Sequence, residues 1–132
     1  MIRQATEQDI PAISSLIHAE SGMWQDGWND DVIFRALKSS NGLAFVWDHD
    51  GILGFVCGHE VGFRGYLSEL VVAPNFRRKG IGRRLILHAQ QELANRGCHL
   101  VIADIWHEAE PFYDSLGWIP VTNMVSLRKK DL

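Results

Sequence analysis

The segment from Val72 to Arg84, VAPNFRRKGIGRR, constrains the fold more than any other part of the chain. An apolar, strand-like run over residues 66–72 leads into it, and apolar residues at helical spacing continue after it to Arg96. A second apolar, β-branched run follows over residues 99–105. A strand, a long helix and a further strand in this order predict one parallel crossover.

Basic residues and glycines gather where this helix is predicted to begin. The formal net charge is −3, yet five of the thirteen Lys and Arg residues lie close together: Arg77, Arg78, Lys79, Arg83 and Arg84. Gly80 and Gly82 interrupt this cluster and would let a ligand approach the backbone. Because a helix N-terminus offers unpaired amides and about half a positive charge, the pattern suits a diphosphate. A glycine-rich helix start beside a solvated basic surface is the alternative that remains open.

Two common phosphate-binding motifs do not fit this segment. The Walker motif places its lysine after both glycines, whereas Lys79 precedes them, and the dinucleotide motif needs a glycine where Leu85 stands. The pattern that remains is Arg77-x-x-Gly80-x-Gly82, between a strand and a helix. It resembles the acetyl-CoA pyrophosphate loop of the GNAT N-acetyltransferase superfamily.

A second segment carries the same resemblance. The run AEPFYDSLGW, Ala109 to Trp118, resembles the family pattern Ala-x-x-[Phe/Leu]-Tyr-x-x-x-Gly-[Phe/Trp]. One position departs from the family: Trp106 stands where many members have Asn, so the contact of that Asn to CoA is not carried over to this chain. His107 is the side chain that could take its place.

The resemblance covers essentially the whole chain, and it implies a single N-acetyltransferase domain over residues 1–132. The implied fold class is α+β with α-β-α layers: a GNAT fold whose mixed, mostly antiparallel sheet contains one parallel crossover, in the order βααβββαβαβ. Hydrophobic periodicity, capping residues and turn residues predict the same order. The expected strands are 1–5, 43–48, 52–61, 66–72, 99–105 and 121–128, and the expected helices are 6–19, 31–38, 80–96 and 108–116.

Composition limits the class of protein. No apolar run approaches the roughly 20 residues that cross a bilayer, and the N-terminal segment lacks a basic stretch followed by an apolar one. We therefore expect a cytoplasmic protein without a membrane partner, in which Cys57 and Cys98 are free thiols. The slightly acidic net charge argues against nucleic acid as a partner. We expect no metal site, because the pair His107-Glu108 has no third ligand at suitable spacing.

The resemblance implies how acetyl-CoA is held as co-substrate. Its pantetheine arm is expected against the backbone of Leu70, Val71 and Val72, where the two crossover strands of the family separate. The amides expected to surround the pyrophosphate belong to Arg78, Lys79, Gly80, Ile81, Gly82 and Arg83. Arg77 occupies the first position of the motif.

Acetyl transfer to an amine needs a base and benefits from an acid. A lysine-like amine with a pKa near 10.4 is almost wholly protonated at neutral pH, so a group must remove a proton. Glu69, beside the expected cofactor, is the candidate base. Strand alternation would place Ser68 on the opposite face, unless a bulge changes which face is presented. Tyr113 matches the general-acid tyrosine of the family, although a packing role remains open; His107 and Glu108 are further candidate bases.

The acceptor is expected between the first two helices. The segment ESGMWQDGWNDD carries Trp24, Asp26 and Trp28, and acidic groups beside aromatic rings suit a cationic amine. An exposed acidic loop with core-packing tryptophans is the alternative. The function implied is acetyl-CoA-dependent N-acetyl transfer to a small-molecule or peptide primary amine, by direct attack in a ternary complex. Alternatives are a non-catalytic acyl-CoA-binding regulatory module of the same fold and a nucleotide- or anion-binding domain. Family members are often dimers, which implies a homodimer here.

Overall fold

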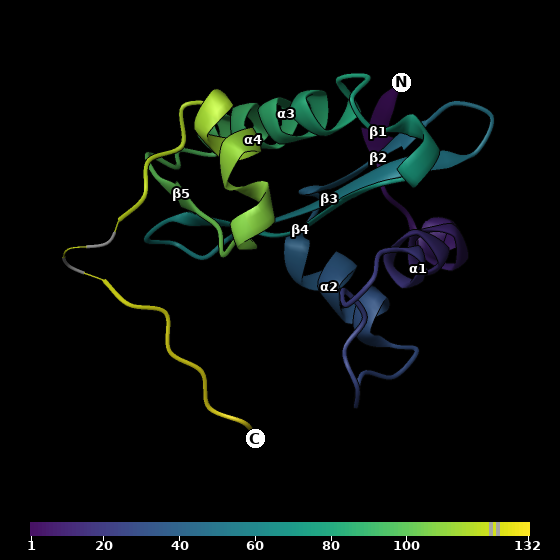
Figure 1. Ribbon diagram of the computed structural model, residues 1–132, viewed down its shortest axis with the longest axis horizontal. Helices are drawn as coiled ribbons and strands as arrows, with labels where there is room; N and C mark the ends of the chain where they lie inside the picture. The colour runs from purple at the N-terminus through teal and green to yellow at the C-terminus, as the bar shows by residue number, and fades with distance from the viewer. Residues whose placement is uncertain (122, 124) are drawn as a thin grey trace.

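A five-stranded sheet lies between two pairs of helices in the computed structural model, which describes residues 1–121, 123 and 125–132. The helices α3 and α4 cover one face of the sheet, and α1 and α2 cover the other (Figure 1). The strands are β1 (Ile2–Gln4), β2 (Ala44–Asp48), β3 (Ile52–Glu60), β4 (Gly65–Val72) and β5 (Val101–Ile102). The helices are α1 (Ile10–Ala19), α2 (Val32–Ser40), α3 (Ile81–Asn95) and α4 (Glu110–Ser115), with 3-10 turns at Glu7–Asp9, Pro74–Phe76 and His107–Ala109.

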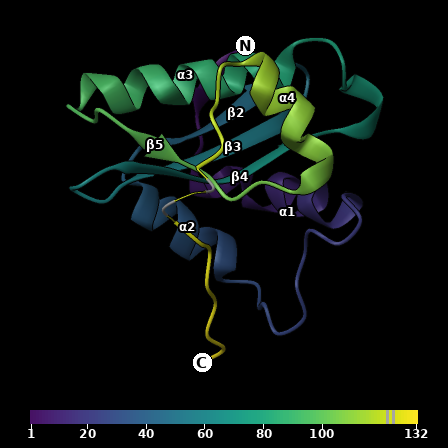
Figure 2. The ribbon, with the colours of Figure 1, turned by 60° about the vertical axis from the view of Figure 1, so that its left-hand side comes forward.

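The sheet has the order β1-β2-β3-β4-β5, so each strand pairs with its neighbour in the chain. The first three pairings are antiparallel, and β4 and β5 are parallel. The helix α3 makes the connection between these two parallel strands, as Figure 2 shows. The predicted crossover within a mostly antiparallel sheet is therefore confirmed.

Apolar residues at helical spacing explain how α3 is seated on the sheet. Its buried side chains are Ile81, Leu85, Ile86, Ala89 and Leu93. The sheet beneath this helix carries glycines. A Cβ at Gly54 would lie 2.9 Å from Leu85 Cδ1, and one at Gly65 would lie 2.8 Å from Leu93 Cδ2. These two glycines let α3 lie close to β3 and β4, which places the start of the helix at the end of β4.

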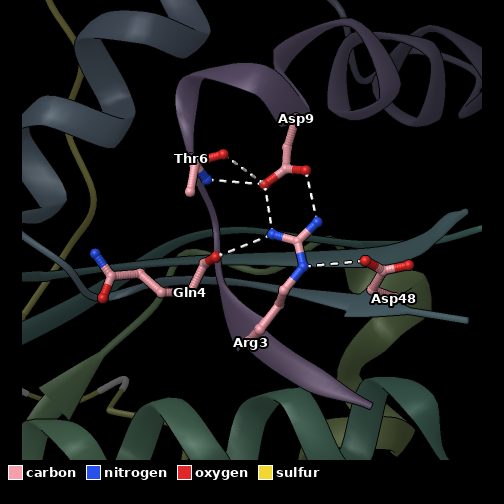
Figure 3. Close-up of polar contacts among 5 residues, drawn as sticks. All are labelled: Arg3, Gln4, Thr6, Asp9 and Asp48. Atoms are coloured by element: carbon pink, nitrogen blue, oxygen red, sulfur yellow. Dashed lines mark hydrogen bonds and ion pairs between the residues drawn. The ribbon is translucent and has the colours of Figure 1, made fainter.

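A charged cluster ties the first strand to the first helical turn (Figure 3). Arg3 donates to both carboxylate oxygens of Asp9 at 2.8 Å, and its Nε donates to Asp48 Oδ2 at 3.0 Å. The backbone N–H of Thr6 donates to the same Asp9 carboxylate at 2.8 Å. These contacts hold the pKa of Asp9 below its usual range, with the Arg3 hydrogen bonds as the largest cause.

The end of α3 and the turn at residues 49–51 lie where glycine residues predicted them. Gly97 follows α3 at a φ of 95°, and its N–H donates to Ala94 O at 3.0 Å, while Cys98 N–H donates to Leu93 O at 3.1 Å. This arrangement satisfies carbonyl groups of the last turn. The turn at residues 49–51 is also confirmed, since it joins the antiparallel strands β2 and β3 and contains Gly51 at a φ of 127°.

The observed strands do not cover two of the predicted ones in full. The expected strand over 99–105 is shorter in the structure, because only Val101–Ile102 pairs with β4 and the chain then diverges from it. The expected strand over 121–128 includes residues 122 and 124, which lie outside the described residues, and its described residues belong to no helix or strand.

Among the helices in the described part of the chain, none combines the length and the apolar character needed to cross a bilayer.

Candidate active site

The divergence of β4 and β5 opens a cavity of about 780 Å³ at the end of the sheet. Four segments line it: the chain after α1, the second half of β4, the start of α3, and the chain from Asp104 into α4. Of the predicted site residues and candidate bases, those lining the cavity are Trp28, Glu69, Leu70, Val71, Val72, Arg77, Arg78, Gly80, Ile81, Gly82, Arg83, Glu108 and Tyr113, whereas His107 does not line it. Most residues that sequence reasoning assigned to a cofactor or to catalysis therefore meet around one space.

The loop between β4 and α3 presents backbone to this cavity. Arg78 adopts a positive φ of 62° and Gly80 one of 84°, so the chain turns sharply before the helix begins at Ile81. At Gly82, a Cβ would meet only ordinary contacts, 3.5 Å from Phe112 Cζ and 3.6 Å from Val72 Cγ2. At Gly80, nothing lies within 4 Å of a Cβ built on the backbone, so the start of α3 borders the cavity without side-chain cover at this position, as a bound anion requires.

The basic residues of the loop divide into two kinds. Arg77 is held by protein groups: its Nε donates to Val72 O at 3.2 Å and its guanidinium forms an ion pair with Glu20. Arg78 and Arg83 are exposed and line the cavity. Lys79 is exposed and lies over the ring of Phe76, 5.3 Å from its centroid, but it does not line the cavity. Arg77, Arg78 and Arg83 therefore all border the cavity, and Arg77 also connects the loop to the end of α1.

A β-bulge changes which residues β4 presents to the cavity. Cys57 lies opposite Glu69 and Gly58 lies opposite Leu67, so Ser68 is an extra residue in β4. Leu67 and Leu70, on either side of the pair, both pack in the core beneath α3. Ser68 and Glu69 consequently both turn to the other face, and both line the cavity. The alternation rule, which would separate them, does not hold here.

Glu69 has an unusual proton affinity. Its carboxyl is half-buried in the cavity wall, and this burial, with the negative charge of Asp104, raises its pKa to about 7. Asp104 accepts a hydrogen bond from the hydroxyl of Tyr66. Burial and this same carboxylate raise the pKa of Tyr66 well above its ordinary value. A carboxyl whose pKa lies near neutrality can take up and release protons at physiological pH.

Tyr113 is buried at the α4 side of the cavity. Its ring packs edge-on against Phe112 and Trp118, with centroids 5.2 Å and 5.3 Å away. Burial, followed by the charge of Asp104, raises the pKa of its hydroxyl to about 12. The hydroxyl therefore keeps its proton near neutral pH and can act as a hydrogen-bond donor to a developing negative charge.

The two cysteines do not provide a nucleophile. Both are free thiols, as expected. Cys57 lies directly opposite Glu69 but is fully buried, and burial raises the pKa of its thiol to about 12. Since the thiolate is the reactive form, Cys57 is inert at neutral pH. Cys98 follows the far end of α3 and does not line the cavity.

The three predicted acceptor residues are placed differently. Trp28 lines the cavity, whereas Trp24 stacks on His18 at 4.2 Å between ring centroids and packs against the core beneath α1. Asp26 is exposed and is not part of the cavity lining. For Trp24, the core-packing alternative describes its position. The acidic residue that this region contributes to the cavity is Glu20.

Sequence reasoning missed the role of Asp104. It follows the short strand β5 at the point where the chain diverges from β4, and it raises the pKa of Glu69, Tyr66 and Tyr113. The available signal was an acidic residue near the end of the apolar run over 99–105. The titratable residues that it affects belong to other segments of the chain, so the sequence alone did not indicate them. Among the described residues, no group of three or more His, Cys, Asp or Glu side chains is placed to hold a metal ion.

Comparison with known proteins gives a consistent result. A model described as the acetyltransferase (GNAT) family matches residues 10–118. The peptidyl-lysine N-acetyltransferase YiaC of Escherichia coli (strain K12) is 33% identical over 129 residues, covering 89% of this chain and 82% of that protein. The fold is similar to that of the ribosomal-protein-S18-alanine N-acetyltransferase from Escherichia coli, with a TM-score of 0.77, 23% identity, and coverage of 92% and 79%. It is also similar to a chain of the NatC complex bound to Gag peptide and CoA, with a TM-score of 0.76, 18% identity, and coverage of 92% and 86%.

Proposed function

The chain belongs to the acetyltransferase (GNAT) family, and we propose that it transfers the acetyl group of acetyl-CoA to a primary amine by direct attack in a ternary complex. One observation carries the proposal. A carboxyl with a pKa of about 7, that of Glu69, shares a cavity with the bare amides of a helix N-terminus and a protonated tyrosine. These are the three groups that the chemistry requires.

Acetyl-CoA is held, in this proposal, along the cavity between β4 and α3. The amides of Gly80, Ile81 and Gly82 receive the pyrophosphate, with Arg78 and Arg83 supplying positive charge at the rim. The backbone of Leu70 to Val72 receives the pantetheine arm. The open space at Gly80 and the separation of β4 from β5 support this fit. Arg77 positions the loop through Glu20 and Val72 instead of meeting the phosphates.

Glu69 prepares the acceptor. An alkylammonium group with a pKa near 10.4 must lose a proton before its nitrogen can attack, which costs roughly 4–5 kcal/mol at pH 7. A carboxylate that binds protons with a pKa near neutrality removes that proton more readily than an ordinary glutamate would. Its position on the cavity side of the bulge supports this assignment.

Tyr113 stabilises the leaving group. When the tetrahedral intermediate collapses, the C–S bond breaks and negative charge develops on the thiolate sulfur. A phenol that stays protonated can donate a hydrogen bond, and then a proton, to this sulfur. Because Cys57 is a buried thiol with a raised pKa, the wall opposite Glu69 offers no competing acyl acceptor, which supports direct attack.

The acceptor class we favour is the side-chain amine of a lysine in a peptide or protein. The name of the 33%-identical relative supports this choice, as does Trp28, an aromatic ring in the cavity wall. The test is release of free CoA from acetyl-CoA with a panel of amines: lysine peptides blocked at the N-terminus, peptides with only a free α-amine, and amino sugars. Transfer to the blocked lysine peptides is the expected result. Acetyl-CoA binding without CoA release for every amine would instead indicate a binding module.

A further inference from the structure

Behind the cavity wall, three side chains form a continuous hydrogen-bonded line from the cavity to the protein surface. Ser68 Oγ, at the bulge in β4, lies 2.8 Å from His59 Nε2 of β3. His59 Nδ1 lies 2.9 Å from Ser39 Oγ at the end of α2. Ser68 lines the cavity, His59 is half-buried, and Ser39 is exposed. The line therefore joins the reaction space to solvent on the α2 side of the sheet.

The direction of these hydrogen bonds follows from their outer end. The hydroxyl of Ser39 donates to the backbone carbonyl of Ala36 at 3.3 Å, so its oxygen is left to accept from the ring of His59. Nδ1 of His59 then carries the proton, and Nε2 presents its lone pair to Ser68. Ser68 Oγ also lies 3.4 Å from the carbonyl oxygen of Cys57, but Nε2 is nearer at 2.8 Å, so the hydroxyl proton is directed to the Nε2 lone pair. A hydroxyl facing a reaction space, a base behind it and a third group that orients the base form the arrangement that accepts protons in acid–base catalysis.

The surroundings of His59 keep its ring neutral before reaction. Burial lowers its pKa below the ordinary value. The titratable groups beside it are Cys57 on β3, whose Sγ lies 3.5 Å from Nε2, and Tyr66 on β4, whose ring stacks at 6.1 Å. Both stay protonated, because burial raises their pKa values, and Glu69 adds to that effect on each. From α2, the ring meets Ser39, which does not titrate.

We propose that His59 is a positioning residue that acts through Ser68, accepting one of the two protons that the attacking nitrogen loses. The inference rests on the proposed acetyl transfer. Glu69 takes the first proton, from the ammonium group. After attack, the nitrogen carries a second excess proton, which passes to Ser68 Oγ while the hydroxyl proton of Ser68 moves to His59 Nε2. His59 holds this proton as an imidazolium, and Nε2 returns it through Ser68 to water in the cavity once the products leave, which restores the Nδ1–H tautomer. The thiolate takes its own proton from Tyr113, which then regains one from water, while Glu69 releases its proton to water.

The first test is independent of activity. Nitrogen chemical shifts of the His59 ring, measured by NMR on the intact protein, are expected to show the Nδ1–H tautomer with a pKa below the ordinary histidine value. Ser39→Ala is expected to shift the tautomer population, because it removes the acceptor of the Nδ1 proton. The Nε2–H tautomer in the unmodified protein would overturn the proposal.

The second test is the pH profile of kcat/KM. His59→Gln and Ser68→Ala are each expected to lower kcat by about 10²-fold, with the KM for acetyl-CoA unchanged. In the unmodified protein, the fall of kcat/KM toward acidic pH should become steeper below the pKa of His59. The reason is that the reaction needs both Glu69 and His59 unprotonated, and below this pH both take up protons. His59→Gln should remove this second step and leave the Glu69 step near pH 7.

His88→Gln is the matched control, since His88 is also half-buried but packs against Phe45 outside the cavity. It should leave rate and profile unchanged. If His59→Gln has normal activity and the unmodified protein transfers acetyl groups, the proposed proton transfer through Ser68 to His59 is overturned, whereas the proposed function is not. An unmodified protein that binds acetyl-CoA but acetylates no amine would overturn both.

Discussion

Ser68 and Glu69 are consecutive residues of β4, yet both turn to the same face of the sheet. The extra residue at the bulge produces this departure from strand alternation. It puts a carboxyl and a hydroxyl together in the wall of a cavity that the N-terminus of α3 also borders. The proposed chemistry of the site depends on this local irregularity.

Replacing Glu69 tests the base directly. Glu69→Gln keeps the size of the side chain but removes its proton affinity, so we expect kcat/KM to fall by about 10² to 10⁴-fold. Acetyl-CoA affinity, measured by calorimetry, should not change. Glu60→Gln is the matched control, because Glu60 lies at the end of β3 outside the cavity and accepts a hydrogen bond from Gly62 N–H. Equal rates for the two variants would exclude Glu69 as the base.

The charge of Asp104 should affect the pKa of Glu69 and therefore the pH dependence of the rate. Burial, together with the charge of Asp104, raises the pKa of Glu69 to about 7, so Asp104→Asn should lower that pKa in part. The rate requires the unprotonated carboxylate, and the acid limb of the kcat/KM profile should therefore move to lower pH. The measurement is the pH midpoint of that limb. A limb that stays in place would show that the two carboxyl groups do not interact.

Tyr113 should matter for turnover more than for binding. Tyr113→Phe removes the hydroxyl but keeps the ring that packs on Phe112 and Trp118, so stability should be nearly preserved. We expect kcat to fall by about 10²-fold, while the dissociation constant of acetyl-CoA stays similar. Since the pKa of this hydroxyl is about 12, the unmodified enzyme should show no loss of rate from Tyr113 ionisation below pH 10. A variant with full turnover would leave Tyr113 a packing residue.

Gly82 tests the cofactor loop. A Cβ at this position meets only contacts of 3.5 Å or longer. Gly82→Ala should therefore fold and still bind acetyl-CoA. Gly82→Glu places a carboxylate where the pyrophosphate is proposed to lie, and it should abolish binding while the circular dichroism spectrum stays native. Binding is read by thermal shift with acetyl-CoA. Normal affinity of Gly82→Glu would refute the loop assignment.

The Arg3–Asp9 pair should stabilise the fold in a pH-dependent way. Asp9 is 8% exposed at its side chain, and Arg3→Met would leave its carboxylate with Thr6 as donor. We expect a loss of about 2 kcal/mol in the free energy of unfolding at pH 7. Because the folded pKa of Asp9 is lowered, this contribution is present above the unfolded pKa and lost as pH falls through the folded one.

Arg35→Met is the matched control for that variant. Arg35 forms an exposed i,i+4 pair with Asp31 at 3.2 Å, which should contribute less than about 0.5 kcal/mol. Urea denaturation of both variants at pH 7 and pH 3 makes the comparison. Equal stability losses at the two pH values for Arg3→Met would contradict the electrostatic account.

The element order and the loop were readable from the sequence because both rest on local patterns. Apolar spacing predicted α3 to within one residue of its observed bounds, Ile81–Asn95, and glycines marked its ends. The position of Tyr113 beside the loop followed from the family resemblance. The expected strand over 99–105 was too long, since apolar character indicates burial but does not reveal where a neighbouring strand diverges.

The sequence by itself determined the layered fold, the crossover and the position of the glycine-containing loop before α3, because helical and strand periodicities, capping residues and turn residues act over a few neighbouring positions. Only the tertiary structure decided which side chains meet in the cavity wall. The bulge at Ser68, the charge that Asp104 exerts on Glu69 and the link from Ser68 through His59 to Ser39 each join segments distant in the chain. Proton affinity depends on burial and on charges brought together by folding, and no local pattern of residues records either.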